Sequence, residues 1–261
     1  MRILVTVKWV PDLQSQRSFT DGAVTRVAED GTMNELDENA VEAALQLVEE
    51  HGGEVYALTV GPADAHAAVR KALQLGAHHA IHVSDEQIAG SDVFATARVL
   101  AGAIQKVHDE EPLDMVITGM GALDGLTSML PTALAVHLGW SQLSLASSLE
   151  VADGKATIVR HLPDAHETVE APLPAVVSVT DEANKPRYPN FKLIMAARKA
   201  EVPTWSLEDI GVDPLTAGVA GSRTTVVDAS PRPPRENVQI VTDTGEGGST
   251  LAEYLIERGL A

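Results

Sequence analysis

The chain has 261 residues, a formal net charge of −18 at pH 7, no cysteine, and 44% hydrophobic but only 3% aromatic residues. This charge argues against a surface for nucleic acids or anionic membranes, because such surfaces need many Lys and Arg side chains to displace counterions. The missing cysteines exclude disulfides, thiolate metal sites and thiol nucleophiles. Because no apolar run approaches ~18 residues and the chain starts directly on a strand, we expect a soluble, cytoplasmic protein.

Short apolar strands and amphipathic helices alternate along the first ~140 residues, which is typical of a parallel sheet wound with right-handed crossovers. A further strand, rich in small and β-branched residues, suits burial on both faces of such a sheet. We therefore predict an α/β fold with a doubly wound, mostly parallel, Rossmann-like sheet. The strands are expected at 2–7, 54–60, 79–83, 113–118 and 175–179, and the helices at 34–50, 63–75, 93–107 and between Gly125 and Leu138.

Two additions interrupt this alternation. Strand-like runs at 148–151 and 156–160 flank Asp153-Gly154, a strong β-hairpin signal. A Pro-rich run at 231–235 is typical of a stiff linker, and a last helix is expected at 249–258. We predict one α/β domain over 1–228, and a linker and C-terminal helix over 229–261 that pack on the core or on another chain.

Ligands of open parallel sheets bind at the carboxyl ends of the strands, so the loops after the first and fourth strands are the candidate sites. Residues 119–128 combine three glycines with Asp124, Thr127 and Ser128 just before a helix. Backbone N–H groups at a helix start favour an anion, so a phosphate is physically reasonable. Taken alone, the segment is better explained as a Gly-rich turn before an ordinary helix N-cap, because it contains neither G-x-G-x-x-G nor a P-loop lysine.

The sequence contains no recognisable catalytic or metal-binding arrangement. The nine histidines form no H-E-x-x-H or similar ligand set. Neither G-x-S-x-G, nor Ser-His-Asp, nor a pair of carboxylates stands out. We therefore predict no metal site, no catalytic residue and no enzymatic activity of the side chains.

The stretch from Leu173 to Lys199 carries the most distinctive pattern. A buried strand leads into a charged loop at 181–189, whose two prolines exclude a central strand. Apolar residues then recur at helical spacing before a positively charged end, which favours a helix C-terminus. Taken alone, Phe191 is better interpreted as a core residue of this helix.

This stretch closely resembles the signature of the electron transfer flavoprotein β-subunit family. Here the chain reads LPAVVSV, N-K-P-R-Y-P and I-M-A-A-R-K, where the family reads LPAVV, N-E-P-R-Y and I-M-x-A-x-K. The resemblance covers residues 1 to about 212. It implies an adenine-nucleotide-binding type of Rossmann-like fold and a heterodimer with an α subunit, onto which the tail reaches.

The resemblance also implies a role and a docking surface. Such a protein takes electrons from flavin dehydrogenases, for example acyl-CoA dehydrogenases in fatty acid oxidation, and passes them to a quinone oxidoreductase. Residues 181–199 become the recognition loop, in which Phe191 is the apolar side chain that enters a pocket of the dehydrogenase. The docking residues carried over are Asn184, Pro186, Arg187, Tyr188, Phe191, Ile194 and Met195.

Two cofactors follow from the same resemblance, an AMP without a redox role and an FAD held mainly by the α subunit. Leu13 and Leu36 match the residues that cover the edge of the FAD, although both also fit plain core leucines. The AMP positions carried over are Thr6, Asn34, Leu36, Asp37, Val60, Asp124, Gly125, Leu126, Thr127, Ser128, Met129, Leu130 and Thr132.

The chain departs from the family pattern at two places. In the run D-G-D-T-G-Q, Leu126, Ser128 and Met129 replace D, G and Q, and some family members hold a second FAD there. His161 stands where the family usually has an acid that contacts an α-subunit arginine, and an imidazole cannot supply that negative charge.

Two other classes of protein stay open. A free-standing adenine-nucleotide-binding module of the stress-protein type uses the same sheet and the 119–128 loop, but gives no role to the hairpin, the loop at 184–189 or the tail. An ATP-pyrophosphatase fold is the third hypothesis, although its S-G-G-x-D-S run is missing. Only the β-subunit hypothesis predicts a yellow complex with a second chain.

Overall fold

The computed structural model describes two compact units, Met1–Ala229 and Ser230–Ala261. Pro231, the first residue of the predicted Pro-rich run, lies outside the described residues. The described residues are those of the whole chain except Gln16, Arg17, Asp21, Gly22, Pro231, Asn237, Gln239, Val241 and Ala261.

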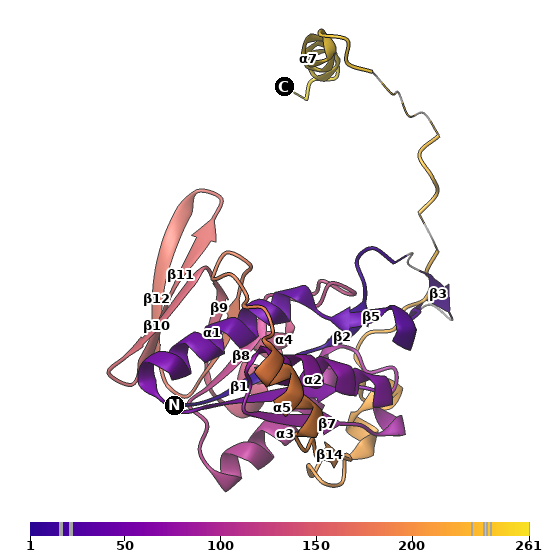
Figure 1. Cartoon of the computed structure of the whole chain (residues 1–261). Coiled ribbons are helices and arrows are strands. Elements are labelled where there is room, and N and C mark those ends of the chain that lie inside the picture. Colours follow the sequence, from indigo (N-terminus) through magenta and orange to yellow (C-terminus); the bar gives the residue numbers. More distant parts are fainter. Residues whose placement is uncertain are drawn as a thin grey trace. The chain divides into compact units, whose positions relative to one another are not determined.

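A parallel sheet of seven strands forms the centre of the first unit (Figure 1). β1 lies in the middle, between β6 and β8, and its Val5 pairs with Ala57 and Ile117. The predicted doubly wound α/β fold is therefore confirmed. In spatial order the strands are β14 (Thr204–Trp205), β7 (His79–Val83), β6 (Glu54–Val60), β1 (Arg2–Thr6), β8 (Met115–Gly119), β13 (Ala175–Val179) and β9 (Ser141–Ala146).

Helices cover both faces of this sheet. α1 (Glu35–His51) and α2 (His66–Leu75) form one hydrophobic core with Ile3 and Val5 of β1. α3 (Val93–Glu110) and α4 (Leu130–Leu138) form a second core with Leu4. Successive residues of β1 enter opposite cores because side chains alternate across a strand.

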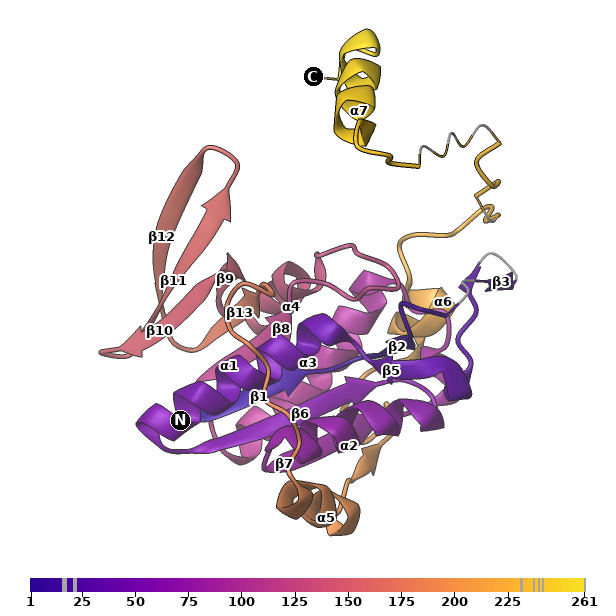
Figure 2. The same cartoon turned by 45° about the horizontal axis from the view of Figure 1, so that its top comes forward.

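The segment after α4 differs from the prediction. β9 was missed, and the predicted two-stranded hairpin is an antiparallel sheet of three strands, β10 (Ser148–Ala152), β11 (Lys155–Leu162) and β12 (Ala165–Pro172). Its long strands extend beyond the central sheet (Figure 2). β12 carries polar residues on both faces and is partly exposed throughout, so it has no apolar run that marks it as a strand.

Several short elements complete the described chain. In the second unit, α7 (Gly247–Glu257) begins two residues before the predicted helix and ends one residue before its predicted end. No described helix combines the length and hydrophobicity needed to cross a membrane. The other elements are β2 (Trp9–Pro11), β3 (Phe19–Thr20), β4 (Ala23–Val24), β5 (Gly31–Met33), α5 (Phe191–Lys199), α6 (Gly218–Gly221) and the 3-10 turns Ala28–Asp30, Ala63–Ala65, Glu86–Ile88 and Pro214–Thr216.

β8 ends on a glycine because the first turn of α1 passes too close for a side chain. A Cβ on Gly119 would lie 2.6 Å from Asp37 Oδ1 and 2.7 Å from the Leu36 carbonyl oxygen.

Gly119→Ala must displace the first turn of α1, so we expect the free energy of unfolding to fall by roughly 1–3 kcal/mol in urea denaturation. Gly125→Ala is the matched control, because a Cβ there meets no described atom within 4 Å. Equal losses in both variants would contradict this packing.

Candidate functional site

The predicted nucleotide residues lie at the carboxyl ends of the central strands, on one side of the sheet that we call the nucleotide edge. Thr6 ends β1, Val60 ends β6, and residues 124–132 follow β8. β1 pairs directly with both β6 and β8, so these three ends are neighbours. The start of α1 lies at the same edge, because it contacts the last residue of β8.

The buried side chain of Asn34 joins the start of α1 to the loop after β8. Its Nδ2 donates to the Gly121 carbonyl at 3.1 Å and to Asp37 Oδ1 at 2.9 Å. Its Oδ1 accepts from the Leu123 backbone N–H at 3.0 Å. Asn34 therefore fixes the shape of the loop, and its side chain is fully used within the chain.

Asp37 is a buried carboxyl beside the end of β1. Its Oδ2 accepts from the Lys8 backbone N–H at 2.8 Å, and its Oδ1 accepts from Asn34. Burial raises the pKa of Asp37 to about 7, although the hydrogen bonds from Asn34 and Lys8 act in the opposite direction. This carboxyl therefore changes its charge near neutral pH.

Asp124 is an anchor of the loop. Its carboxylate accepts from Lys8 Nζ at 2.8 Å, and from Arg26 Nε at 2.9 Å and Nη2 at 2.5 Å. Burial acts to raise the pKa of Asp124, but the charges and hydrogen bonds of Lys8 and Arg26 hold it below its usual value. Sequence reasoning missed both cations. Lys8 follows the first strand closely enough to have been considered, whereas Arg26 stands in a polar segment without a recognisable pattern.

Residues 125–129 are exposed and lead into an open helix start. In the described part of the chain, no side chain caps α4, which disagrees with an ordinary capped helix. Leu126 and Ser128 have φ of 49° and 50°, a region that Asp and Gly adopt more readily. The family run D-G-D-T-G-Q has those two residue types at these positions, so Leu126 and Ser128 take a backbone conformation that the family residues adopt more readily.

The remaining nucleotide and flavin residues are less clearly grouped. Leu130 is half-buried in the first turn of α4, and the Thr132 hydroxyl accepts from Gln142 Nε2 at 2.8 Å. Leu13 is 50% exposed, so its interpretation as a core leucine is wrong. Leu36 is half-buried in the first turn of α1.

The predicted docking segment leaves its aromatic side chains exposed. Tyr188 is 93% exposed and Phe191 is 78% exposed, so the interpretation of Phe191 as a core residue is wrong. Met195 is exposed, whereas Pro186 and Ile194 are half-buried. Asn184 and Arg187 are hydrogen bonded to α1. Asn190 caps α5 by accepting from the Leu193 backbone N–H at 2.9 Å.

His161 has a carboxylate beside it. Its Nδ1 lies 2.7 Å from Glu182 Oε2, at the start of the docking segment. Its ring also meets the ring of His166 edge-on, with centroids 4.4 Å apart. The negative charge that residue 161 itself does not supply is thus present on its hydrogen-bonded neighbour.

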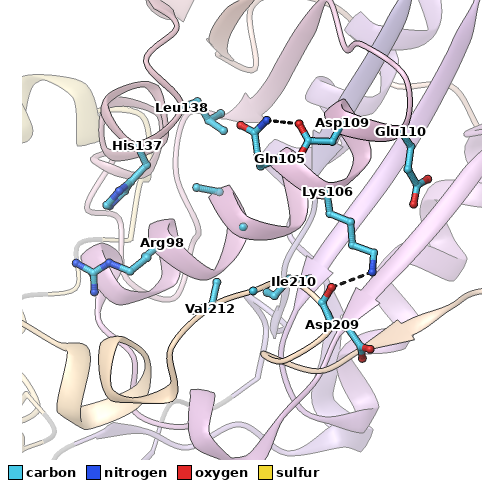
Figure 3. A pocket seen from close by; sticks show the side chains of 13 residues that line it. Arg98, Gln105, Lys106, Asp109, Glu110, His137, Leu138, Asp209, Ile210 and Val212 are labelled. Atoms are coloured by element: carbon cyan, nitrogen blue, oxygen red, sulfur yellow. Dashed lines mark hydrogen bonds between the residues drawn. The ribbon is translucent and has the colours of Figure 1, made fainter.

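Two hollows of the described surface lie elsewhere. One, of about 710 Å³, is bordered by α3, the end of α4 and residues 209–212 (Figure 3). The other, of about 560 Å³, lies beside α2 and is lined in part by Trp9, Met33 and Arg70. All residues that line them are outside the predicted nucleotide, flavin and docking sets. Among the described residues, no group of three or more His, Cys, Asp or Glu side chains is placed to hold a metal ion.

The Asp37 carboxyl makes stability depend on pH. Because its pKa is about 7 in the folded chain and 3.8 ordinarily, the folded state holds the proton more tightly. The free energy of unfolding therefore falls as pH rises through this range and levels off above it. The advantage of wild type over Asp37→Asn should shrink by roughly 2–3 kcal/mol between pH 5 and pH 7 in urea denaturation. A difference that stays constant with pH would contradict the raised pKa.

The comparisons with known proteins cover most of the chain and agree on one family. A family model described as the electron transfer flavoprotein domain matches residues 21–210. The electron transfer flavoprotein subunit beta of Mycobacterium tuberculosis (strain ATCC 25618 / H37Rv) is 41% identical and that of Mycobacterium leprae 40% identical, each over 97% of both chains. The caffeyl-CoA reductase-Etf complex subunit CarD of Acetobacterium woodii is 33% identical over 99% of both chains. The chain therefore belongs to the electron transfer flavoprotein family, among its β subunits.

Proposed function

We propose that this chain is the β subunit of a heterodimeric electron transfer flavoprotein in the cytoplasm. It accepts electrons from flavin dehydrogenases, such as acyl-CoA dehydrogenases, and passes them to a quinone oxidoreductase. Family membership supports electron transport by a flavoprotein, and the name "subunit beta" of its relatives supports pairing with an α subunit. The single observation that carries the docking role is the exposure of Phe191.

The exposed aromatic side chains suit a short-lived redox encounter. Lys192 follows Phe191 directly and Arg198 lies in the last turn of the same helix, and both are exposed, so positive charges accompany the apolar anchor. Buried aromatic anchors dominate the free energy of many interfaces, and redox encounters bury less surface than stable complexes. A small apolar anchor therefore supports selective docking with fast release.

The carboxyl ends of β1, β6 and β8 suit an adenine nucleotide. The uncapped start of α4 offers backbone N–H groups to the phosphate of AMP, and the positive end of the helix dipole favours that charge. Asn34 and Asp124 hold the loop in place through contacts within the chain. We assign AMP to this edge, with Thr6, Val60 and residues 124–132 around it.

The FAD, bound mainly by the α subunit, supplies the redox chemistry. On this chain the half-exposed Leu13 and the half-buried Leu36 offer apolar cover for one edge of the flavin. No side chain of the chain forms or breaks a bond in this proposal; the protein sets the position and environment of the flavin.

The domain arrangement follows from the same assignment. Residues 1–228 form the α/β domain, and 229–261 form an arm that packs on the α subunit. Within its own unit, α7 exposes Leu251, Tyr254 and Ile256, which supports a covered position in the heterodimer.

Truncation of the proposed anchor tests docking. Phe191→Ala should lower kcat/KM for reduction of the heterodimer by an acyl-CoA dehydrogenase about tenfold or more, because a central aromatic contact is lost. FAD content and heterodimer formation should stay at wild-type levels. Val136→Ala, which shortens another exposed apolar side chain, should transfer electrons normally. Loss of FAD from Phe191→Ala would refute a pure docking role.

A carboxylate at the proposed phosphate position tests nucleotide binding. Thr127→Glu adds a negative charge just before α4, where it should repel the phosphate of AMP. The amount of AMP released from the denatured heterodimer should therefore fall roughly several-fold. The FAD content should not change. Val136→Glu places the same charge near the end of α4 and should keep its AMP. Full AMP in Thr127→Glu would place the nucleotide elsewhere.

A further inference from the structure

Helix α1 contacts both parts of the proposed function. At its start, Asn34 is bound to the loop after β8. Farther along, three of its polar side chains, Asn39, Glu42 and Glu49, are bound to residues 184–187 at the beginning of the docking segment. Helix α1 thus connects the nucleotide edge to the docking residues.

The first tie is a reciprocal amide pair. Asn39 Nδ2 donates to the Asn184 carbonyl at 3.1 Å and to Asn184 Oδ1 at 3.2 Å. Asn184 Nδ2 donates back to the Asn39 carbonyl at 3.0 Å. Both side chains take part in this contact, which fixes residue 184 against α1.

The second tie is a double carboxylate clamp on Arg187. Nε donates to Glu42 Oε2 at 2.7 Å, and Nη2 donates to Glu42 Oε1 at 3.2 Å. Nη1 and Nη2 donate to the two oxygens of Glu49 at 2.5 Å and 3.1 Å. The Arg187 backbone N–H also donates to Glu42 Oε2 at 3.2 Å. Fork-to-fork pairing of this kind fixes direction as well as distance.

Glu42 is the buried member of the clamp, with only 6% exposure. It also accepts from Gln46 Nε2 at 2.9 Å within α1. Burial acts to raise the pKa of Glu42, but the hydrogen bonds from Arg187 and Gln46 hold it below its usual value, so the carboxylate stays charged. Such a buried charge strongly favours the conformation in which Arg187 is present.

The residue that follows the clamped Arg187 is exposed. Tyr188 follows Arg187 directly and is 93% exposed. On its other side Asn190 caps α5, which opens with Phe191. The docking side chains are therefore carried on a short segment fixed at both ends.

We propose that Glu42 is a positioning residue for electron transfer: through Arg187 it holds Tyr188 and Phe191 in their docking arrangement, at a set distance from Leu36 in the first turn of α1. This proposal rests on the docking role proposed above. A segment released from α1 samples other conformations, so only a fraction of molecules is competent to dock. The apparent affinity then falls, whereas transfer within a formed complex does not.

The test compares Glu42→Gln with Glu50→Gln in the FAD-loaded heterodimer. Both remove one charge from α1, but Glu50 is exposed at its end and faces His51 at 4.0 Å. Amide hydrogen exchange across residues 184–192 should accelerate in Glu42→Gln alone. With an acyl-CoA dehydrogenase as the reductant, the KM for the flavoprotein should rise about tenfold and kcat should stay within about twofold.

Arg187→Lys provides a second variant that leaves the buried carboxylate with a cation. Lysine keeps the positive charge but cannot pair bidentately with the two carboxylates, so this variant should also accelerate amide hydrogen exchange and raise KM. Wild-type exchange and wild-type KM in both variants would overturn the proposal, as would a loss confined to kcat. A wild-type heterodimer that no dehydrogenase reduces would refute the proposed function instead, and the exchange measurement would still report on the clamp.

Discussion

The close approach of α1 to the end of β8 is the constraint on which the candidate site depends. Gly119 has no side chain, and the Leu36 carbonyl and the Asp37 carboxyl occupy the space where one would stand. This contact allows Asn34 to reach the loop after β8 and Asp37 to reach the backbone of Lys8. The polar groups at the strand ends thus bond to each other, whereas no described side chain caps the start of α4.

Ion pairs within the chain position the loop after β8 and the segment at 184–187. The net charge is −18, yet Asp124 and Glu42 are each matched with cations from distant segments. Asp124 joins the loop after β8 to Lys8 and Arg26 in the segment after β1, and Glu42 joins α1 to Arg187. An electron carrier needs such fixed geometry, because its contribution is distance and orientation rather than bond chemistry. Family membership disfavours the free-standing nucleotide module and the ATP-pyrophosphatase hypothesis.

Local patterns predicted the fold and which loops follow the strand ends, but not how distant segments meet. Alternating apolar strands and helices were sufficient for the parallel sheet, because burial on both faces leaves a clear signal. β9 and β12 were missed because exposed strands mix polar and apolar residues. Arg26 and Glu42 were missed for another reason: their partners, Asp124 and Arg187, are far away in sequence. Phe191 was better interpreted from the family resemblance than from its helical spacing, which suggested burial.

The measurement that tests the account most directly is the flavin and adenine nucleotide content of the heterodimer. The chain is co-expressed with an α subunit, and the ligands released on denaturation of the purified complex are quantified. The account predicts a yellow complex with one FAD and one AMP per heterodimer. Two FAD per heterodimer would contradict the assignment of AMP to the Asp124 loop, and a colourless lone chain with bound ATP would contradict the electron carrier itself.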